Sequence, residues 1–291
     1  MIPRSFEYYA PRALDEAVSL LQKLGSEAKI LSGGQSLIPM MKLRLASPQY
    51  LVDINHIPGL DYISEQNGFL RIGALVRESD LEHSPLIKSR YPLLADTTVM
   101  IADPLVRNQA TVCGNLAHGD PANDHPATML ALEATLVAYS PRGEREIPVV
   151  SFFTGLFSTD LQPDEILKEI RVPVPAPSSG GAYLKLERKV GDYATAGVAV
   201  QITLDGAGVC QRAGIGLTNV GFTPLKATKV EDFLKGRALD ADAIKQASEL
   251  AAGEAQPFDD IRGSADYKRD VVRVLTARAL RQALERARGV A

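Results

Sequence analysis

The stretch Ile30-Leu31-Ser32-Gly33-Gly34-Gln35-Ser36-Leu37-Ile38-Pro39 places two glycines and two polar residues between apolar runs. This pattern predicts a strand that ends in a tight loop. Glycine lacks a Cβ and tolerates positive φ, so the backbone N–H groups of such a loop can converge on one anion. Ser36 adds a hydroxyl and Gln35 an amide, which suits a diphosphate. The pattern is also typical of an ordinary turn, so the rest of the chain must decide.

The composition is that of an ordinary globular protein with room for two domains: 291 residues, 45% hydrophobic and 23% charged. A net charge of −3 gives no reason to expect general attraction to nucleic acid or membranes. No apolar run approaches the roughly 20 residues that span a bilayer, and the N-terminus lacks the apolar segment of a signal peptide. We therefore expect a cytoplasmic protein.

The cysteine pattern argues against a metal centre in this chain. Its two cysteines, Cys113 and Cys210, lie far apart and form no CxxC motif. An iron–sulfur cluster or a structural zinc held by this chain's own cysteines is therefore not expected.

The first half of the chain alternates short helices and strands. Apolar residues at helical spacing predict a helix over Pro11–Gly25, and strands are expected at Ala28–Leu31 and Gln49–Ile54. Asn67-Gly68, between two β-like runs, predicts a hairpin. Two helices broken by prolines are expected over 78–101, no helix over 106–124, a helix at 125–133, and strands at 136–139, 144–149 and 166–172.

A Pro-rich and then Ser-Gly-rich segment, Val172–Gly181, predicts a linker and a domain boundary. After it, three strands of an antiparallel sheet are expected, followed by three helices. The strands are expected over 182–187, 197–204 and 209–219, and the helices over 225–234, 240–252 and 266–288. The many arginines of the last helix are typical of a solvated face.

A second glycine-bearing stretch, Thr111-Val112-Cys113-Gly114-Asn115, has the same character as the first. It offers a hydroxyl, an amide and consecutive backbone N–H groups. Two such loops can hold the two phosphates of a dinucleotide from opposite sides without a Rossmann helix. Common nucleotide motifs are absent: the chain has no Gly-Lys pair, and the GxG pairs at 206–208 and 214–216 lack the third glycine and are expected in a sheet.

The segment His118–His125 contains two histidines and two aspartates, which are suitable metal ligands by type. The same residues suit a loop whose acidic side chains cap turns. We expect the loop and no metal site, with Asp124 as the N-cap of the following helix.

Taken together, these stretches are similar to the FAD-binding medium subunit of molybdenum hydroxylases, the family of aerobic carbon monoxide dehydrogenase and xanthine dehydrogenase. Ser32–Ser36 resembles its AGGxS loop, and Thr111–Asn115 resembles its TxGG(N/D) loop. Ser32 replaces the usual Ala, and Cys113 replaces the first Gly of the second motif. Further matches cover nearly the whole chain, at 118–124, 184–196 and 262–268.

The resemblance implies an α+β fold: a VAO/PCMH-type FAD-binding domain of two α/β subdomains, then a C-terminal domain with a three-stranded antiparallel sheet and a helical bundle. The expected FAD-binding domain covers residues 1–175, with subdomains of about 1–56 and 57–175. The expected C-terminal domain, like that of the CO dehydrogenase flavoprotein, covers residues 176–291.

The resemblance also implies a set of FAD-binding residues. Asp124 matches a position that contacts the ribityl or diphosphate region, Lys185 one near the pyrimidine end of the flavin, and Tyr193 one beside its ring. No catalytic or metal-binding residue is implied in this chain. The implied FAD-binding set is Ser32, Gly33, Gly34, Gln35, Ser36, Leu37, Ile101, Ala102, Thr111, Val112, Cys113, Gly114, Asn115, Asp124, Lys185 and Tyr193.

The implied function is that of an FAD-dependent oxidoreductase subunit for electron transfer. A small partner subunit with [2Fe–2S] clusters would deliver electrons from a large subunit with a molybdenum cofactor. The complex would be a dimer of heterotrimers. It would have no membrane span, and peripheral association with a membrane is compatible with this. Two alternatives stay open: a self-contained flavoprotein oxidoreductase of the same fold, and an FAD-free scaffold. The sequence names neither substrate nor electron acceptor, and it leaves open whether Cys113 has a redox role.

Overall fold

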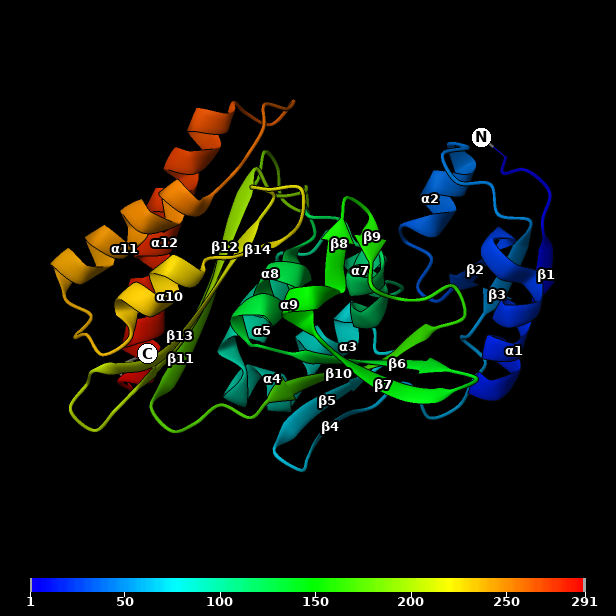
Figure 1. Cartoon of the computed structure of the whole chain (residues 1–291), viewed down its shortest axis with the longest axis horizontal. Helices are drawn as coiled ribbons and strands as arrows, with labels where there is room; N and C mark the ends of the chain where they lie inside the picture. Colours follow the sequence, from blue (N-terminus) through cyan, green and yellow to red (C-terminus); the bar gives the residue numbers. More distant parts are fainter. Residues whose placement is uncertain (1, 290–291) are drawn as a thin grey trace.

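The computed structural model describes residues 2–289, so Met1 and residues 290–291, the outer ends of the expected domains, lie outside it. Three units lie side by side along the long axis of the molecule (Figure 1). A small N-terminal unit lies at one end, a sheet with several short helices forms the centre, and a second sheet covered by long helices forms the other end. This mixed α and β architecture confirms the expected fold class.

The N-terminal unit is a parallel sheet covered by an amphipathic helix. Its strands are β1 (Glu7–Tyr9), β2 (Ala28–Leu31) and β3 (Tyr50–Asp53), in the order β1-β3-β2. Helix α1 (Leu14–Leu24) buries Ala17, Val18 and Leu21 against this sheet. A turn of 3₁₀ helix, η1 (Gly25–Glu27), leads into β2, and α2 (Leu37–Lys42) follows the glycine pair. The predicted helix and both predicted strands are present.

The central unit is built on an antiparallel sheet with the order β4-β5-β10-β6-β7. The predicted hairpin joins β4 (Ile63–Gln66) to β5 (Phe69–Gly73), and Asn67 and Gly68 both have positive φ, as a type I′ turn requires. The remaining strands of the sheet are β6 (Thr135–Ser140), β7 (Gly143–Pro148) and β10 (Ile166–Pro173), and β8 (Phe153–Gly155) with β9 (Ser158–Thr159) forms a separate small hairpin.

The helices of the central unit differ from the prediction. Three helices, not two, fill the region 78–101, because each proline starts a new helix at its first position. They are α3 (Glu78–His83), α4 (Pro85–Arg90) and α5 (Pro92–Val99). The region 106–124, expected to contain no helix, holds the second half of α6 (Pro104–Arg107) and all of α7 (Val112–Ala117). These helices are too short to show a 3.6-residue period in the sequence.

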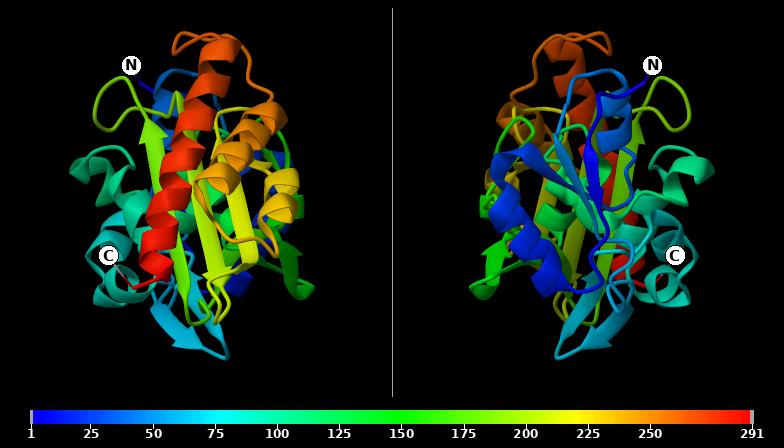
Figure 2. Two further views of the ribbon diagram at one scale, coloured as in Figure 1. Left: turned by 90° about the vertical axis from the view of Figure 1, so that its left-hand side faces the viewer. Right: turned by 90° about the vertical axis from the view of Figure 1, so that its right-hand side faces the viewer.

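The C-terminal unit has an antiparallel sheet with the order β11-β12-β13-β14. Its strands are β11 (Ser179–Leu186), β12 (Ala196–Leu204), β13 (Cys210–Thr218) and the unexpected short β14 (Leu225–Lys226). Three helices, α10 (Thr228–Leu234), α11 (Ala241–Glu254) and α12 (Ala265–Ala287), follow as predicted. Figure 2 shows the long helices lying across one face of this sheet.

The expected linker is shorter than its composition suggests. Residues 179–181 belong to β11, and a Cβ placed on Gly180 would lie 2.1 Å from the Ala283 carbonyl oxygen in α12. These glycines therefore serve close packing between strand and helix, and only residues 174–178 lie between β10 and β11.

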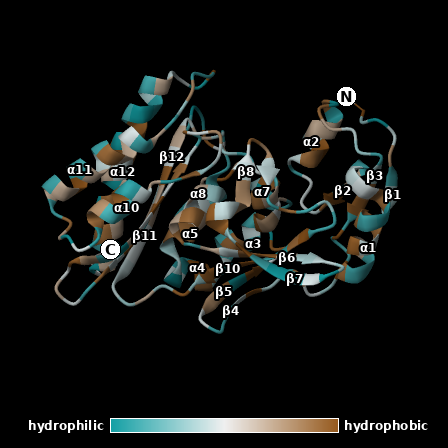
Figure 3. Ribbon diagram, viewed as in Figure 1, coloured by the Kyte–Doolittle hydropathy of each residue, from teal (hydrophilic) through white to brown (hydrophobic). Residues whose placement is uncertain are grey.

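Helix α8 (Asp124–Ala131) joins the central and C-terminal units, and all eight of its residues are buried. On one side, Gly214 and Gly216 of β13 are so close that an added Cβ would lie 2.0 Å and 1.9 Å from the carbonyl oxygens of Ala131 and Ala127. On the other side, α8 belongs to the core of the central unit, which also includes Tyr183 of β11. Figure 3 shows hydrophobic stretches, coloured brown, in α5 and α8.

A short helix, α9 (Val149–Phe152), completes the central unit. Within residues 2–289, no helix is long and apolar enough to cross a membrane.

Candidate cofactor-binding site

The first loop, Ser32–Ser36, lies where β2 ends and α2 begins. Gly34 has a φ of 73°, a conformation that glycine adopts without steric cost. Among the described residues, the backbone N–H groups of residues 33–36 have no hydrogen-bond acceptor. Four consecutive donors are thus left for water or for a ligand.

The second loop, Thr111–Asn115, is not irregular as expected, because it forms the start of α7. Thr111 is the N-cap, and its Oγ1 accepts a hydrogen bond from the Gly114 N–H at 3.2 Å. A Cβ on Gly114 would lie 2.6 Å from that oxygen, so Gly114 makes room for the cap. Neither Cys113 nor Gly114 has a positive φ, so the strain that a cysteine at this position would otherwise cause does not arise.

The structure brings the two loops into direct contact. The Ser32 and Thr111 hydroxyl oxygens lie 3.1 Å apart and share a hydrogen bond. A Cβ on Gly33 would lie 2.4 Å from the Gln109 carbonyl oxygen, so only glycine allows this approach. The serine at position 32, where the resembled motif has alanine, thus adds a link between the loops that the sequence did not reveal.

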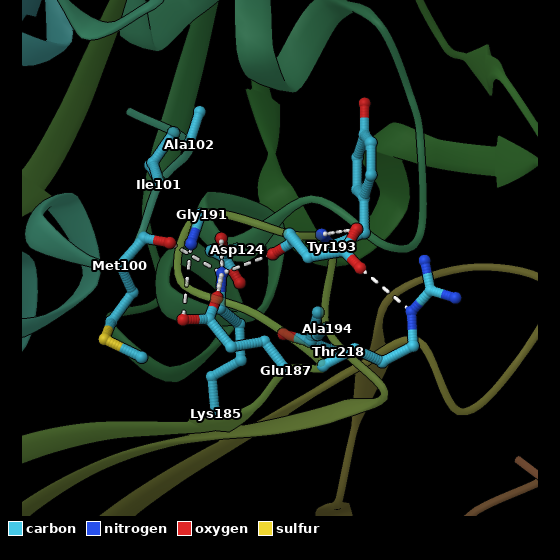
Figure 4. A network of polar contacts seen from close by, with 12 residues as sticks. Met100, Ile101, Ala102, Asp124, Lys185, Glu187, Gly191, Tyr193, Ala194 and Thr218 are labelled. Carbon is cyan, nitrogen blue, oxygen red and sulfur yellow. Dashed lines mark hydrogen bonds and ion pairs between the residues drawn. The ribbon is translucent and has the colours of Figure 1, made fainter. Parts of the chain in front are cut away.

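Lys185 of β11 is the centre of a buried polar cluster at the C-terminal side of the site (Figure 4). Its side chain is 1% exposed, and its ammonium group lies 3.0 Å from Asp124 Oδ2 and 3.2 Å from Glu187 Oε2. It also donates to the carbonyl oxygens of Met100 at 2.6 Å and Asp192 at 3.1 Å. An ammonium has three N–H donors, so these acceptors engage all of them.

Asp124 does not cap α8 as predicted. Asn123 is the N-cap, and the Asp124 carboxylate instead accepts from the Tyr183 hydroxyl at 2.5 Å and from Lys185. Burial raises the pKa of Asp124, which the Lys185 charge opposes. Burial also raises the pKa of Tyr183 well above its ordinary value, so its hydroxyl stays a donor.

The loop after β11 carries Tyr193, whose ring points away from the Lys185 cluster (Figure 4). Tyr193 is 44% exposed, and the Arg262 guanidinium carbon lies 5.6 Å from its ring centroid. Arg262 also bonds Asp192 at 3.1 Å, and this bond, with a second one from Arg188, lowers the Asp192 pKa to about 2. The loop is thereby held to the segment before α12.

Ile101 and Ala102 form a tight turn that contacts the same loop. Ala102 has a φ of 45°, which is uncommon for a residue with a side chain. Arg107 donates to the carbonyl oxygens of both residues, at 2.8 Å and 3.2 Å. A Cβ on Gly191 would lie 2.7 Å from the Ala102 carbonyl oxygen, so the two segments touch through backbone.

The second loop is also linked to the Lys185 cluster. Asn123, which directly precedes Asp124 in the chain, donates its side-chain amide to the Asn115 carbonyl oxygen at 2.9 Å. Asn115 Oδ1 is buried and has no hydrogen-bond partner among the described residues. Free backbone donors and an unpaired amide oxygen, on connected elements, fit a ligand with phosphates and additional polar groups such as FAD.

The candidate metal ligands do not converge. The His118 ring packs against Phe157 at 5.1 Å between centroids, while His125 Nε2 lies 2.7 Å from Glu78 Oε2. Asp120 accepts from the Ala122 N–H, as an acidic turn residue does. Over residues 2–289 no group of three or more His, Cys, Asp or Glu side chains could hold a metal ion.

Sequence reasoning missed two residues that bridge the loops, Asn55 and Arg77. Asn55 Nδ2 donates to the Ser32 carbonyl oxygen at 2.8 Å, and Arg77 donates to both Asn55 Oδ1 and the Gln109 carbonyl oxygen. Neither residue belongs to a glycine motif, and the sequence alone carries no signal that relates them.

Residues 4–175 match the family described as FAD binding domain in molybdopterin dehydrogenase, and residues 181–283 match the CO dehydrogenase flavoprotein C-terminal domain. The chain therefore belongs to the FAD-binding medium chains of the CO dehydrogenase and xanthine dehydrogenase family, an oxidoreductase family, as the resemblance indicated.

Individual relatives agree with this assignment. The chain is 47% identical to the carbon monoxide dehydrogenase medium chain of Hydrogenophaga pseudoflava, with 98% of this chain and 99% of the relative covered. A solved structure of carbon monoxide dehydrogenase from that organism superimposes with a TM-score of 0.95 at 48% identity, covering 98% and 99% of the two chains. Quinoline 2-oxidoreductase from Pseudomonas putida 86 superimposes with a TM-score of 0.91 at 33% identity, covering 100% and 99%.

Proposed function

We propose that this chain is the electron-transfer subunit of a molybdenum hydroxylase complex and that it binds FAD between the two loops. The observation that carries the proposal is the contact of Ser32–Ser36 with Thr111–Asn115, which places the unpaired backbone donors of the first loop beside the second loop. Backbone N–H groups of this kind are suited to phosphate oxygens. Loop residues 32–37 and 111–115 would hold the diphosphate of FAD.

Bound FAD would supply the ability to accept electrons one at a time and to pass them on. The chain's own residues would set the surroundings. Lys185 and Asp124 form a buried ion pair. Because all three N–H donors of Lys185 are engaged within the chain, Lys185 would act on the flavin through its charge and by holding the Met100 carbonyl group in place. Tyr193, beside the flavin ring, would cover one face and control the access of an acceptor. Ile101 and Ala102 would lie at the adenine side.

We further propose that electrons reach this chain from a small subunit with [2Fe–2S] clusters and, before that, from a large subunit with a molybdenum cofactor. The complex would be a cytoplasmic dimer of heterotrimers. Support comes from relatives that are named as the medium chain of a dehydrogenase or as a subunit of a dehydrogenase complex. Substrate oxidation by this purified chain without partner subunits would contradict the proposal.

The decisive experiment replaces the two packing glycines in the complex as it is co-purified with its partners. Gly33→Val together with Gly114→Val is expected to abolish FAD binding. The added side chains would strike the Gln109 carbonyl oxygen and the Thr111 hydroxyl and would force the loops apart. FAD released by acid is measured per complex by absorbance.

Gly206→Val together with Gly253→Val is the matched control, because a Cβ at either position meets nothing within 4 Å and neither φ is positive. The control is expected to retain FAD. Stoichiometric FAD in the Gly33/Gly114 variant would refute the loop assignment, and a wild-type complex without flavin would favour a scaffold subunit.

A further inference from the structure

Arg77 and Asn55 form a bridge between the two loops that is separate from their direct contact. Arg77 Nη1 lies 2.5 Å from the Gln109 carbonyl oxygen, two residues before Thr111, and Nη2 lies 2.6 Å from Asn55 Oδ1. Asn55 Nδ2 in turn lies 2.8 Å from the Ser32 carbonyl oxygen. The planar guanidinium presents its donors in a fixed fork, so the bridge also fixes a separation.

The N-terminal unit holds its end of this bridge rigidly. Asp53, the last residue of β3, accepts from the Asn55 backbone at 2.9 Å and from its amide at 2.6 Å through Oδ1. Its other oxygen accepts from the Tyr8 hydroxyl at 2.5 Å. Asn55 is thus oriented by the carboxylate, with its Oδ1 left to face Arg77.

The central unit holds the other end. Arg77 directly precedes α3, and its backbone N–H donates to Asp80 Oδ2 at 3.0 Å. The next residue, Glu78, donates its backbone N–H to the Ala110 carbonyl oxygen at 2.9 Å, and Val112 donates to the Val76 carbonyl oxygen at 3.1 Å. The backbone on either side of Arg77 is therefore bonded to the second loop and to the residue just before it.

The charge of Arg77 has no carboxylate partner within ion-pair distance among residues 2–289. Its donors go to uncharged oxygens, and burial lowers its pKa, although the charges of Asp80 and Asp53 oppose this from beyond that distance. Arginines on the strands of the central sheet, such as Arg71 and Arg145, instead pair directly with carboxylates.

We propose that Arg77 and Asn55 are positioning residues that fix the separation of the loops Ser32–Ser36 and Thr111–Asn115 and thereby set the affinity for the FAD diphosphate. The inference rests on the proposed function, because it assumes that these loops hold the diphosphate. Each loop belongs to a different unit, so without the bridge the unpaired donors of the first loop lose their alignment with the second. The bridge of Arg77 and Asn55, called the clamp below, thus joins the two loops into one binding site.

The test compares Arg77→Met, Arg77→Lys and Asn55→Ala in the co-purified complex. The dissociation constant is measured from flavin fluorescence as FAD is titrated into flavin-depleted complex. Arg77→Met and Asn55→Ala are expected to bind FAD roughly 10- to 100-fold more weakly, the range for losing a hydrogen bond to a charged group. Arg77→Lys is expected to be nearly as defective, because one ammonium cannot span both acceptors.

The Arg77→Lys variant keeps the positive charge but cannot reach both acceptors. It therefore distinguishes a clamp that holds the loops from simple attraction between the charge and the FAD phosphates. Wild-type affinity in Arg77→Lys would overturn the proposal, as would wild-type affinity in Arg77→Met. Arg142→Met is the matched control, since Arg142 pairs with Asp164 at 2.6 Å on a distant turn with its side chain 62% exposed. A loss of affinity in this control equal to that in Arg77→Met would also overturn it.

Hydrogen exchange gives a readout that does not require FAD. The Ile54 N–H bonds the Leu31 carbonyl oxygen at 3.0 Å, and the Glu78 N–H bonds the Ala110 carbonyl oxygen, so both report on the loops. Faster exchange at these amides in Arg77→Met and Asn55→Ala supports the clamp, and unchanged exchange overturns it. If the wild-type complex held no flavin, the proposed function would fail. Hydrogen exchange would still show whether Arg77 and Asn55 hold the two loops together.

Discussion

Cys113 shows how one residue can depart from a motif without changing the backbone. Its thiol is buried in α7, with Sγ 3.9 Å and 3.7 Å from the carbonyl oxygens of Ile72 and Gly73. Its position has helical backbone, so a side chain is tolerated where the resembled motif has glycine. The thiol faces the central sheet, which makes it part of the core.

Neither cysteine is expected to react with iodoacetamide in the native protein at pH 8. Burial raises the pKa of both thiols, that of Cys210 to about 11, so the reactive thiolate is scarce. Because a raised thiol pKa disfavours the thiolate in the folded state, reactivity should appear only at higher pH or on unfolding. Mass spectrometry after labelling, with a guanidinium-unfolded sample as control, checks this; native labelling of Cys113 would reopen a redox role for it.

Among elements, α8 depends on the glycines of the strand beneath it. Gly216→Ala is expected to destabilise the protein by about 1–3 kcal/mol, because the new methyl would overlap the Ala127 carbonyl oxygen and move α8. Urea unfolding of the variant measures this. Gly206→Ala, in open space, serves as control, and equal stability of the two variants would contradict the close packing of α8 on β13.

The elements also show which parts of the fold the sequence predicts. Long periodic helices such as α1, α11 and α12, and the Asn67-Gly68 hairpin, follow from local pattern alone. Helices α6 and α7 do not, because four and six residues with side-chain caps show no period. Likewise the sequence identified Gly214 and Gly216 as sheet residues, but their role depends on a helix about 85 positions earlier in the chain.

The candidate site divides in the same way. The glycine loops are visible because backbone requirements restrict residue type at those positions. The bridge of Arg77 and Asn55, and the buried partners of Lys185, are contacts between distant segments of ordinary polar residues. Only the fold brings them together, so the sequence predicted the ligand class better than the residues that position it.

At the scale of the whole molecule, we propose domains 1–175 and 176–291, with subdomains of about 1–56 and 57–175. The two domains are expected not to fold separately, because separating them would expose α8, the face of β13 and the Asp96–Arg286 ion pair. Each fragment expressed alone should aggregate or bind the dye ANS, whereas co-expressed fragments should associate. Two stable, soluble fragments with cooperative unfolding would contradict this expectation.

The complete burial of α8 also bears on how quickly charge could move through the protein. Asp124 begins this helix and bonds Lys185 and Tyr183, so its carboxylate is fixed by both domains at once. Under the proposed function, polar groups held this way change position little when an electron arrives or leaves. The nuclear rearrangement that accompanies each transfer is then small, which favours fast transfer without any motion between domains.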